Sequence, residues 1–233
     1  MRSVLVTRPE PGASATAKRL AAMGFSPVLL PLTEIVATPP PAHAPCDAVV
    51  VTSANALRCA PAGYLAGLAA KPLFAVGAAT AAAARAAGFA DIAIAAGTAV
   101  DLAALIGREA QPGAQLLHLA GRDRTAGFEA ALRQDGFAVE IVETYAAEEL
   151  FHSGGFIRER LNDAALWGAL AFSERGGALL ARLAGREGLS HHFEETRFFC
   201  ISDKVAATLA GRRTIVEAEP GEEAVLALLS SQM

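Results

Sequence analysis

The chain has 233 residues, enough for one large domain or two domains of roughly 100–120 residues each. Its formal net charge of −4 argues against a nucleic-acid binder, because such proteins usually carry a strongly basic surface. The three cysteines, Cys46, Cys59 and Cys200, are too few and too widely spaced for a zinc site or a disulfide framework, which indicates a reducing, cytoplasmic compartment. The apolar run before Arg8 is too short for a signal peptide, and charged, Gly or Pro residues keep every apolar stretch below the ~20 residues of a membrane span.

Along the chain, short apolar strands alternate with Ala-rich amphipathic helices. This alternation is typical of βαβ units and predicts an α/β fold with mostly parallel sheets. Thr98 and Asp101 have the spacing of a capping box at the start of one helix, and Gly136 stands where another helix should end in a left-handed residue. The predicted strand–helix segments are 4–33, 48–57, 74–88, 92–106, 116–145, 168–177, 199–211 and 215–229.

The pattern is internally duplicated. Val4–Thr33 aligns without gaps on Leu116–Tyr145, with Gly24 opposite Gly136. In the same order, 48–57, 74–88 and 92–106 resemble 168–177, 199–211 and 215–229. Chance similarity among Ala-rich helices is the alternative, but the shared order of the segments favours duplication.

Two segments have the composition of linkers. Residues 37–46 contain four prolines, which stiffen the chain and exclude it from a central strand. Residues 146–155 break the apolar pattern with charge and glycine. Each linker follows the first unit of a repeated pair, so each domain is expected to combine one unit of each type.

Polar residues follow the predicted strands at their carboxyl ends, where parallel α/β sheets bind ligands. Small and hydroxyl residues there leave helix N-terminal N–H groups available to carboxylates or phosphates, and the basic residues add positive charge. The alternative is that the hydroxyls only cap helices and the arginines lie on solvated loops. These residues are Thr7, Arg8, Thr52, Ser53, Asn55, Gly77, Thr80, Arg122, Arg124, Ser173, Arg175, Ser202 and Lys204.

Familiar catalytic motifs do not occur in the sequence. A phosphate-binding loop of the type G-x-x-x-x-G-K-[ST] and a G-x-G-x-x-G motif after a strand are both missing, which disfavours a nucleotide-dependent Rossmann enzyme. His191-His192 is expected to be a solvated loop and not a metal pair, and His118, within an apolar strand, is expected to be a packed core residue. The sequence thus indicates anion recognition without a metal or cofactor.

Six segments together resemble uroporphyrinogen-III synthases, in that family's order and over nearly the whole chain. They read VLVTRP, VVVTSANAL, AVGAATAAAARAAGF, VETY, AFSERGG and FFCISDKVAATLAG. The resemblance implies two similar Rossmann-like or flavodoxin-like domains with parallel sheets, joined by a two-stranded linker, with a cleft between them. Residues 1–36 with 150–233 would form the terminal domain, and 40–146 the middle domain.

The resemblance also implies a cofactor-free lyase reaction of tetrapyrrole biosynthesis. Hydroxymethylbilane would lose its hydroxyl and close to uroporphyrinogen III with inversion of ring D. The substrate is a polyanion, and the enzyme that supplies it would be a further partner; the protein is expected to be a cytoplasmic monomer that binds neither nucleic acid nor membranes.

By the resemblance, Tyr145 matches the family's candidate for the leaving-group acid. The positions that match residues lining the family's cleft are Thr7, Thr52, Ser53, Asn55, Thr80, Ser173 and Ser202. A Tyr145 that merely bridges core and solvent is the alternative. The family's loop at this position often reads G-x-x-T-A, as Gly77–Ala81 does here, whereas this chain has Ser202-Asp203-Lys204. As a consequence, Asp203 would oppose a substrate carboxylate unless Lys204 neutralises it. A non-catalytic two-lobed binding protein for an anionic small molecule is the alternative function.

Overall fold

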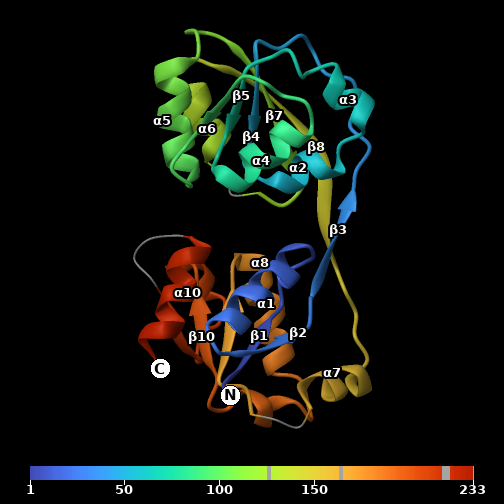
Figure 1. Cartoon of the computed structure of the whole chain (residues 1–233), viewed down its shortest axis with the longest axis vertical. Coiled ribbons are helices and arrows are strands. Elements are labelled where there is room, and N and C mark those ends of the chain that lie inside the picture. Colours follow the sequence, from blue (N-terminus) through green and yellow to red (C-terminus); the bar gives the residue numbers. More distant parts are fainter. Residues whose placement is uncertain (125–126, 163–164, 217–220, 233) are drawn as a thin grey trace. The chain divides into compact units, whose positions relative to one another are not determined.

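The computed structural model describes residues 1–124, 127–162, 165–216 and 221–232. The chain divides into a terminal unit, Met1–Glu34 with Glu148–Met233, and a middle unit, Ile35–Ala147 (Figure 1). Both chain ends therefore belong to the terminal unit. The predicted repeat segment 215–229 includes residues 217–220, and the segment 116–145 includes 125–126; these lie outside the described residues.

The terminal unit is a parallel sheet with helices on both faces. Its strands run in the order β11-β10-β9-β1-β2, and each neighbouring pair is parallel. Its elements are β1 (Ser3–Val6), α1 (Gly12–Ala22), β2 (Ser26–Leu29), α7 (Gly154–Leu161), β9 (Gly168–Ala171), α8 (Glu174–Ala184), the 3₁₀ helix η1 (Ser190–Phe193), β10 (Arg197–Cys200), α9 (Asp203–Ala207), β11 (Arg213–Val216) and α10 (Glu222–Ser231).

The middle unit repeats this plan in a different chain order. Its strands run β3-β8-β7-β4-β5-β6, and β8 to β6 are all parallel. Its elements are β3 (Thr33–Ala37), β4 (Ala48–Val51), α2 (Ala54–Cys59), α3 (Ala62–Ala66), β5 (Leu73–Ala75), α4 (Ala78–Ala86), β6 (Ile92–Ile94), α5 (Ala99–Glu109), β7 (Gln115–Gly121), α6 (Phe128–Gln134) and β8 (Ala138–Glu149).

The two sheets confirm the duplication predicted from the sequence. With β7 and β8 taken as the counterparts of β1 and β2, the strands of both units follow the flavodoxin-like order 2-1-3-4-5. The remaining counterparts, β4 with β9, β5 with β10 and β6 with β11, are the strands of the segments that resemble each other. The predicted α/β class with parallel sheets is therefore confirmed.

The middle sheet shows how the apolar pattern builds these layers. Successive β4 residues point to opposite faces, so Val49 and Val51 pack with α2, α3 and α4, whereas Ala48 and Val50 pack with α5 and α6 (Figure 1). Both faces of a parallel sheet are covered, which explains the continuous apolar run of β4. The four hydrophobic clusters of the described residues each draw on one unit only.

The chain passes between the units twice, along β3 and along β8, and these segments pair. The Thr38 N–H donates to the Thr144 carbonyl oxygen at 2.8 Å, and the Leu150 N–H donates to the Leu32 carbonyl oxygen at 2.9 Å. The partner's number falls as the residue number rises, which is the pattern of antiparallel strands. β8 extends to Glu149, so the first residues of the predicted linker 146–155 form a strand, and the two crossing segments are paired as a two-stranded linker.

Of three further expectations, two are confirmed and one is wrong for one of its residues. Thr98 and Asp101 form the predicted capping box at α5, and Gly136 has the predicted left-handed conformation, with φ 91°. The solvated loop predicted for His191-His192 is wrong for His192, which lies in η1 with 1% of its surface exposed. None of the described helices is long and apolar enough to cross a membrane.

Candidate functional site

The predicted site residues lie at the carboxyl ends of the strands of both sheets. In each unit the strand order reverses once, between β1 and β9 in the terminal unit and between β7 and β4 in the middle unit. Loops diverge at such a reversal and leave room for a ligand. Arg8 and Ser173 flank the first reversal, whereas Arg122 and Ser53 flank the second. The structure thus gathers the predicted residues into two polar edges, one in each unit.

Tyr145 lies beside the reversal of the middle sheet. It pairs with Gly121 in the register of β7 and β8, and the Arg122 N–H donates to the Tyr145 carbonyl oxygen at 2.9 Å. A methyl group added to Gly121 would lie 2.6 Å from Cζ and 2.9 Å from the hydroxyl of Tyr145. The phenol ring therefore lies directly over the glycine, in space that any other residue type would fill.

The Ser53 hydroxyl interacts with the Tyr145 phenol. Ser53 is the N-cap of α2, and its hydroxyl also accepts from the Asn55 N–H at 3.3 Å. Burial raises the pKa of Tyr145 above its ordinary value, although the Ser53 hydroxyl partly opposes this by stabilising the phenolate. The phenol is therefore protonated at neutral pH and can donate a proton or a hydrogen bond.

A second group at this edge joins the predicted residue Thr52 to His118 and Glu129, which were not predicted as site residues. The Thr52 hydroxyl lies 3.1 Å from Nε2 of His118, and Nδ1 of His118 lies 3.1 Å from Oε1 of Glu129. Only 1% of His118 and 7% of Glu129 is exposed, and the His118 ring also contacts Phe128 edge-on. The core location expected for His118 is confirmed. From the sequence, burial of His118 implied only that its ring nitrogens would have hydrogen-bond partners, because buried polar groups are hydrogen-bonded. It did not indicate which residues these would be.

Arg124 completes this group. Its Nε lies 3.2 Å from Oε1 of Glu129, and its Nη1 lies 2.9 Å from Oε1 of Glu143. The same Nη1 donates to the carbonyl oxygens of Gly121 and Arg122. Arg124 thus ties the loop after β7 to α6 and β8, and its charge is matched by two carboxylates.

The loop after β5 contributes backbone groups. Gly77 is the N-cap of α4 and offers no side chain to cap it, so the first N–H groups of this helix lack a side-chain acceptor. Thr80, in the first turn, is 4% exposed and belongs to the core. Asn55, one strand away, accepts from Arg58 at 3.3 Å through its side-chain oxygen.

In the terminal unit, Arg8 is held by internal contacts. Its Nη1 lies 2.6 Å from Oε2 of Glu222 and donates to the Thr16 hydroxyl at 3.2 Å, and its guanidinium lies 4.7 Å from the centre of the Phe172 ring. Thr7 is 5% exposed, and its carbonyl oxygen accepts from the Leu32 N–H. These contacts favour a structural role for the pair, because the charge of Arg8 is already matched.

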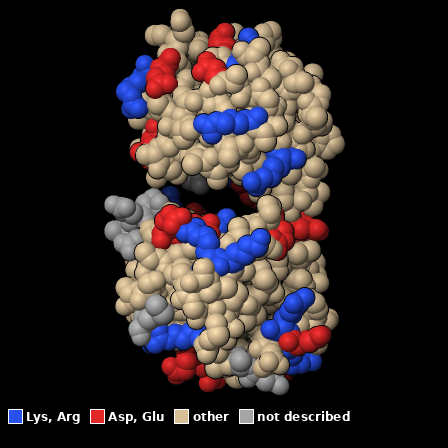
Figure 2. Space-filling model, in the orientation of Figure 1, with Lys and Arg blue, Asp and Glu red and all other residues tan. Residues whose placement is uncertain are grey.

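Ser173 and Ser202 cap the helices that follow them. Their hydroxyls accept from the N–H groups of Gly176 at 3.0 Å and Val205 at 3.4 Å. Helix capping, the alternative considered for these hydroxyls, is therefore what they do in this structure. Arg175 and Lys204 are exposed in the first turns of α8 and α9. On the face drawn in Figure 2, basic and acidic side chains are interspersed on both units, without a continuous basic band.

A family model described as uroporphyrinogen-III synthase HemD matches residues 14–227. The chain belongs to the uroporphyrinogen-III synthase family. The predicted family is therefore confirmed, and with it the place of this chain in tetrapyrrole biosynthesis.

Solved structures of this family have the same fold. The uroporphyrinogen-III synthetase of Helicobacter pylori is 18% identical over the full length of both chains, with a TM-score of 0.65. A mutant uroporphyrinogen III synthase of Thermus thermophilus is 17% identical over 100% of this chain and 97% of its own, with a TM-score of 0.55. No curated protein is significantly similar in sequence. At this identity the likeness supports the two-domain fold alone.

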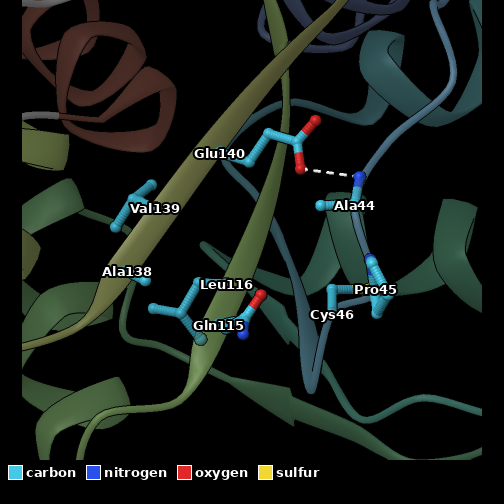
Figure 3. Close-up of a pocket in the computed structure, with 8 residues that line it drawn as sticks. All are labelled: Ala44, Pro45, Cys46, Gln115, Leu116, Ala138, Val139 and Glu140. Atoms are coloured by element: carbon cyan, nitrogen blue, oxygen red, sulfur yellow. Dashed lines mark hydrogen bonds between the residues drawn. The ribbon is translucent and has the colours of Figure 1, made fainter.

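A pocket with a volume of about 240 Å³ lies away from the candidate site residues. It lies at the amino ends of β4, β7 and β8, the opposite edge of the middle sheet from Thr52 and Tyr145 (Figure 3). Among its lining residues, Oε2 of Glu140 accepts from the Ala44 N–H at 3.0 Å. Its lining residues are Ala44, Pro45, Cys46, Gln115, Leu116, Ala138, Val139 and Glu140. Within the described part of the chain, no cluster of three or more His, Cys, Asp or Glu side chains could hold a metal ion.

Proposed function

We propose that this chain is an active uroporphyrinogen-III synthase that converts hydroxymethylbilane to uroporphyrinogen III. The hydroxyl of the substrate leaves as water, and the macrocycle closes with inversion of ring D. The observation that carries this proposal is the membership of the family together with a partly buried, protonated Tyr145 beside Gly121 and Ser53. No cofactor enters the proposed reaction.

Tyr145 is the proposed general acid. A hydroxyl group leaves more easily when a proton is delivered to it, and a positioned acid typically contributes 10²–10⁴-fold in rate. Partial burial raises the pKa of Tyr145 further above neutral pH, so the phenol carries the proton that it would deliver. The substrate's own pyrroles stabilise the cation that forms, so that positioning can supply much of the remaining catalysis.

The two polar edges are the proposed substrate contacts. Hydroxymethylbilane carries carboxylates along its length, which suit the uncapped N–H groups of α4 and the exposed charges of Arg122, Arg175 and Lys204. We further propose that the two units are the two domains of the family, 1–36 with 150–233 and 40–146, and that they bind the substrate between them. The protein would act as a monomer on substrate released by the enzyme that makes it.

The test is a product assay. Purified protein is given hydroxymethylbilane, and the products are oxidised and separated into type I and type III isomers. Enzymatic closure with ring inversion yields the type III isomer, whereas spontaneous closure yields type I. If only type I appears at the rate seen without protein, the proposal is wrong. Tight binding of the substrate without turnover would instead favour the non-catalytic binding protein.

A further inference from the structure

The contacts of Thr52, His118 and Glu129 form a chain that leads from the buried core to the carboxyl edge of the middle sheet. Glu129 lies on α6, His118 on β7, and Thr52 directly follows β4 at the strand-order reversal. Because His118 and Glu129 are almost fully buried, their hydrogens and lone pairs have few other partners. The directions of the two hydrogen bonds can therefore be worked out.

The hydrogen-bond directions follow from the carboxylate of Glu129. Its Oε1 lies 3.2 Å from Nε of Arg124 and 3.1 Å from Nδ1 of His118. A carboxylate paired with a guanidinium can only accept, so Nδ1 of His118 must carry a hydrogen and donate it. Burial lowers the pKa of His118, more strongly than the Glu129 carboxylate raises it, so the ring is neutral at pH 7. Nε2 is then an acceptor, and the Thr52 hydroxyl must donate to it.

Thr52 can therefore act toward a ligand only as a hydrogen-bond acceptor. Its only hydrogen is bound by His118, so Oγ1 can offer lone pairs but no donor. A carboxylate, which only accepts, would be repelled at this position. We propose that His118 and Glu129 are positioning residues that hold the Thr52 hydroxyl as a hydrogen-bond acceptor for a pyrrole N–H of the substrate. The identity of the donor rests on the proposed function.

A hydrogen-bond acceptor at Thr52 suits the reaction. When the hydroxyl leaves the terminal pyrrole, positive charge develops on that ring and is shared by its N–H group, which becomes a stronger donor. An acceptor fixed in advance therefore binds the transition state more tightly than the substrate. The Glu129 carboxylate orients the acceptor through the His118 ring, and no proton needs to move along the chain.

The direction of these hydrogen bonds is tested directly by nitrogen NMR of the full-length protein labelled with ¹⁵N. The imidazole signals of His118 are assigned by their loss in His118→Gln, and two-bond correlations show which ring nitrogen carries the hydrogen. We expect a neutral ring with the hydrogen on Nδ1. A hydrogen on Nε2, or on both nitrogens at pH 7, would overturn the proposal. Glu129→Gln keeps an accepting oxygen and should preserve this tautomer, whereas Glu129→Leu should not.

The role toward the substrate is tested by steady-state kinetics with hydroxymethylbilane. Thr52→Val keeps the shape but removes the acceptor, and we expect kcat to fall on the order of 10-fold or more while KM changes little. Thr52→Ser, which keeps the hydroxyl, should recover most of the loss. A rise in KM with kcat unchanged would mean that Thr52 binds a carboxylate or another ground-state group, and would refute the inference. Failure of the wild-type protein to form the type III isomer would refute the proposed function instead, and the tautomer measurement would still decide the polarity of Thr52.

Discussion

At Tyr145, burial and the Ser53 hydroxyl shift the pKa of the phenol in opposite directions. Burial disfavours the phenolate, whereas the Ser53 hydroxyl stabilises it, and burial has the larger effect on the pKa. Gly121 provides the space in which this balance is set, because its missing side chain lets the ring lie over the backbone of β7. Three residues from different strands and loops therefore define the state of one proton.

Tyr145→Phe is expected to lower kcat by about 10²-fold or more and to change KM much less. The reason is that a leaving-group acid acts mainly in the transition state. Turnover of hydroxymethylbilane to the type III isomer measures it, and Tyr64→Phe, at the other tyrosine of the chain, is the matched control. An unchanged kcat in Tyr145→Phe would remove this residue from the role of acid.

Gly121→Ala is expected to displace the Tyr145 ring while the protein still folds. The added methyl group would lie 2.6 Å from Cζ, and the end of a side chain can move away more easily than backbone. Ultraviolet titration of the phenols should show a changed pKa for Tyr145, and kcat should fall toward that of Tyr145→Phe. Gly107→Ala is the control, since no atom lies within 4 Å of its added methyl group. Normal titration and turnover in Gly121→Ala would show that the ring does not need this space.

Stability is expected to decline at alkaline pH. Burial raises the pKa of Cys200 to about 11 and that of Tyr64 to about 12, above their unfolded values. Because the neutral forms are the ones favoured by folding, this stability is complete below about pH 9 and is lost as the pH rises through about 9–12. Urea unfolding between pH 8 and pH 12 measures the decline.

Tyr64→Phe provides the control for this prediction. Its hydroxyl is buried and has no hydrogen-bond partner among the described residues, so its removal should leave the stability at pH 8 unchanged or slightly higher. The decline between pH 10 and pH 12 should become smaller. An identical pH profile would show that Tyr64 does not contribute to it.

The elements at the polar edges differ in how their helices begin. Ser53, Ser173 and Ser202 cap their helices through a hydroxyl, and Thr98 does so through a complete capping box with Asp101. Gly77 caps α4 through no side chain. Hydroxyls that are bound to the helix in this way stabilise the element, whereas the N-cap of α4 makes no side-chain hydrogen bond.

Thr98→Ala is expected to lower the free energy of unfolding by about 1 kcal/mol, because it removes both bonds of the Thr98 hydroxyl to Asp101. Urea unfolding measures the change. Val100→Ala, in the same turn of α5 but 78% exposed, should change the stability by less than about 0.5 kcal/mol. Equal effects of the two substitutions would show that the capping box contributes nothing.

On the scale of the whole molecule, each unit has its own hydrophobic clusters. Residues 35–147 are continuous in sequence, and their clusters contain no residue of the terminal unit. The terminal unit is assembled from both chain ends, because β1 lies between β2 and β9 in its sheet. Its folding therefore requires two distant segments, whereas the middle unit requires one.

We expect residues 35–147 to fold alone, with cooperative urea unfolding and dispersed NMR spectra. Residues 148–233 alone should not fold, because they lack β1 and β2 from the sheet. Joining residue 34 to residue 148 through a short Gly-Ser linker should restore folding, since Leu32 and Leu150 are hydrogen-bonded neighbours. A cooperative transition in residues 148–233 alone would contradict this view of the sheet.

Much of the fold followed from local pattern. Apolar runs bounded by Gly and polar residues placed the strands, and the order of the repeated segments predicted two sheets of one plan, as the structure confirms. The same patterns placed the candidate residues at strand ends. They failed at His192, which tertiary packing buries. They did not show that β8 extends to Glu149 through charged residues, because that extension depends on pairing with the segment after Leu32.

The sequence by itself determined the family, the strand–helix order and the edges at which polar residues gather, because each of these depends on local spacing or on the order of segments. Only the tertiary structure decided which side chains meet there. Thr52 and His118 are 66 residues apart, and Arg8 and Glu222 are 214 apart, yet both pairs are in contact. Such contacts depend on the register of neighbouring strands and the packing of helices against them. For this reason Arg8, predicted as a substrate contact, was found in an internal ion pair, whereas His118, predicted as a plain core residue, was found in contact with Thr52 and Glu129.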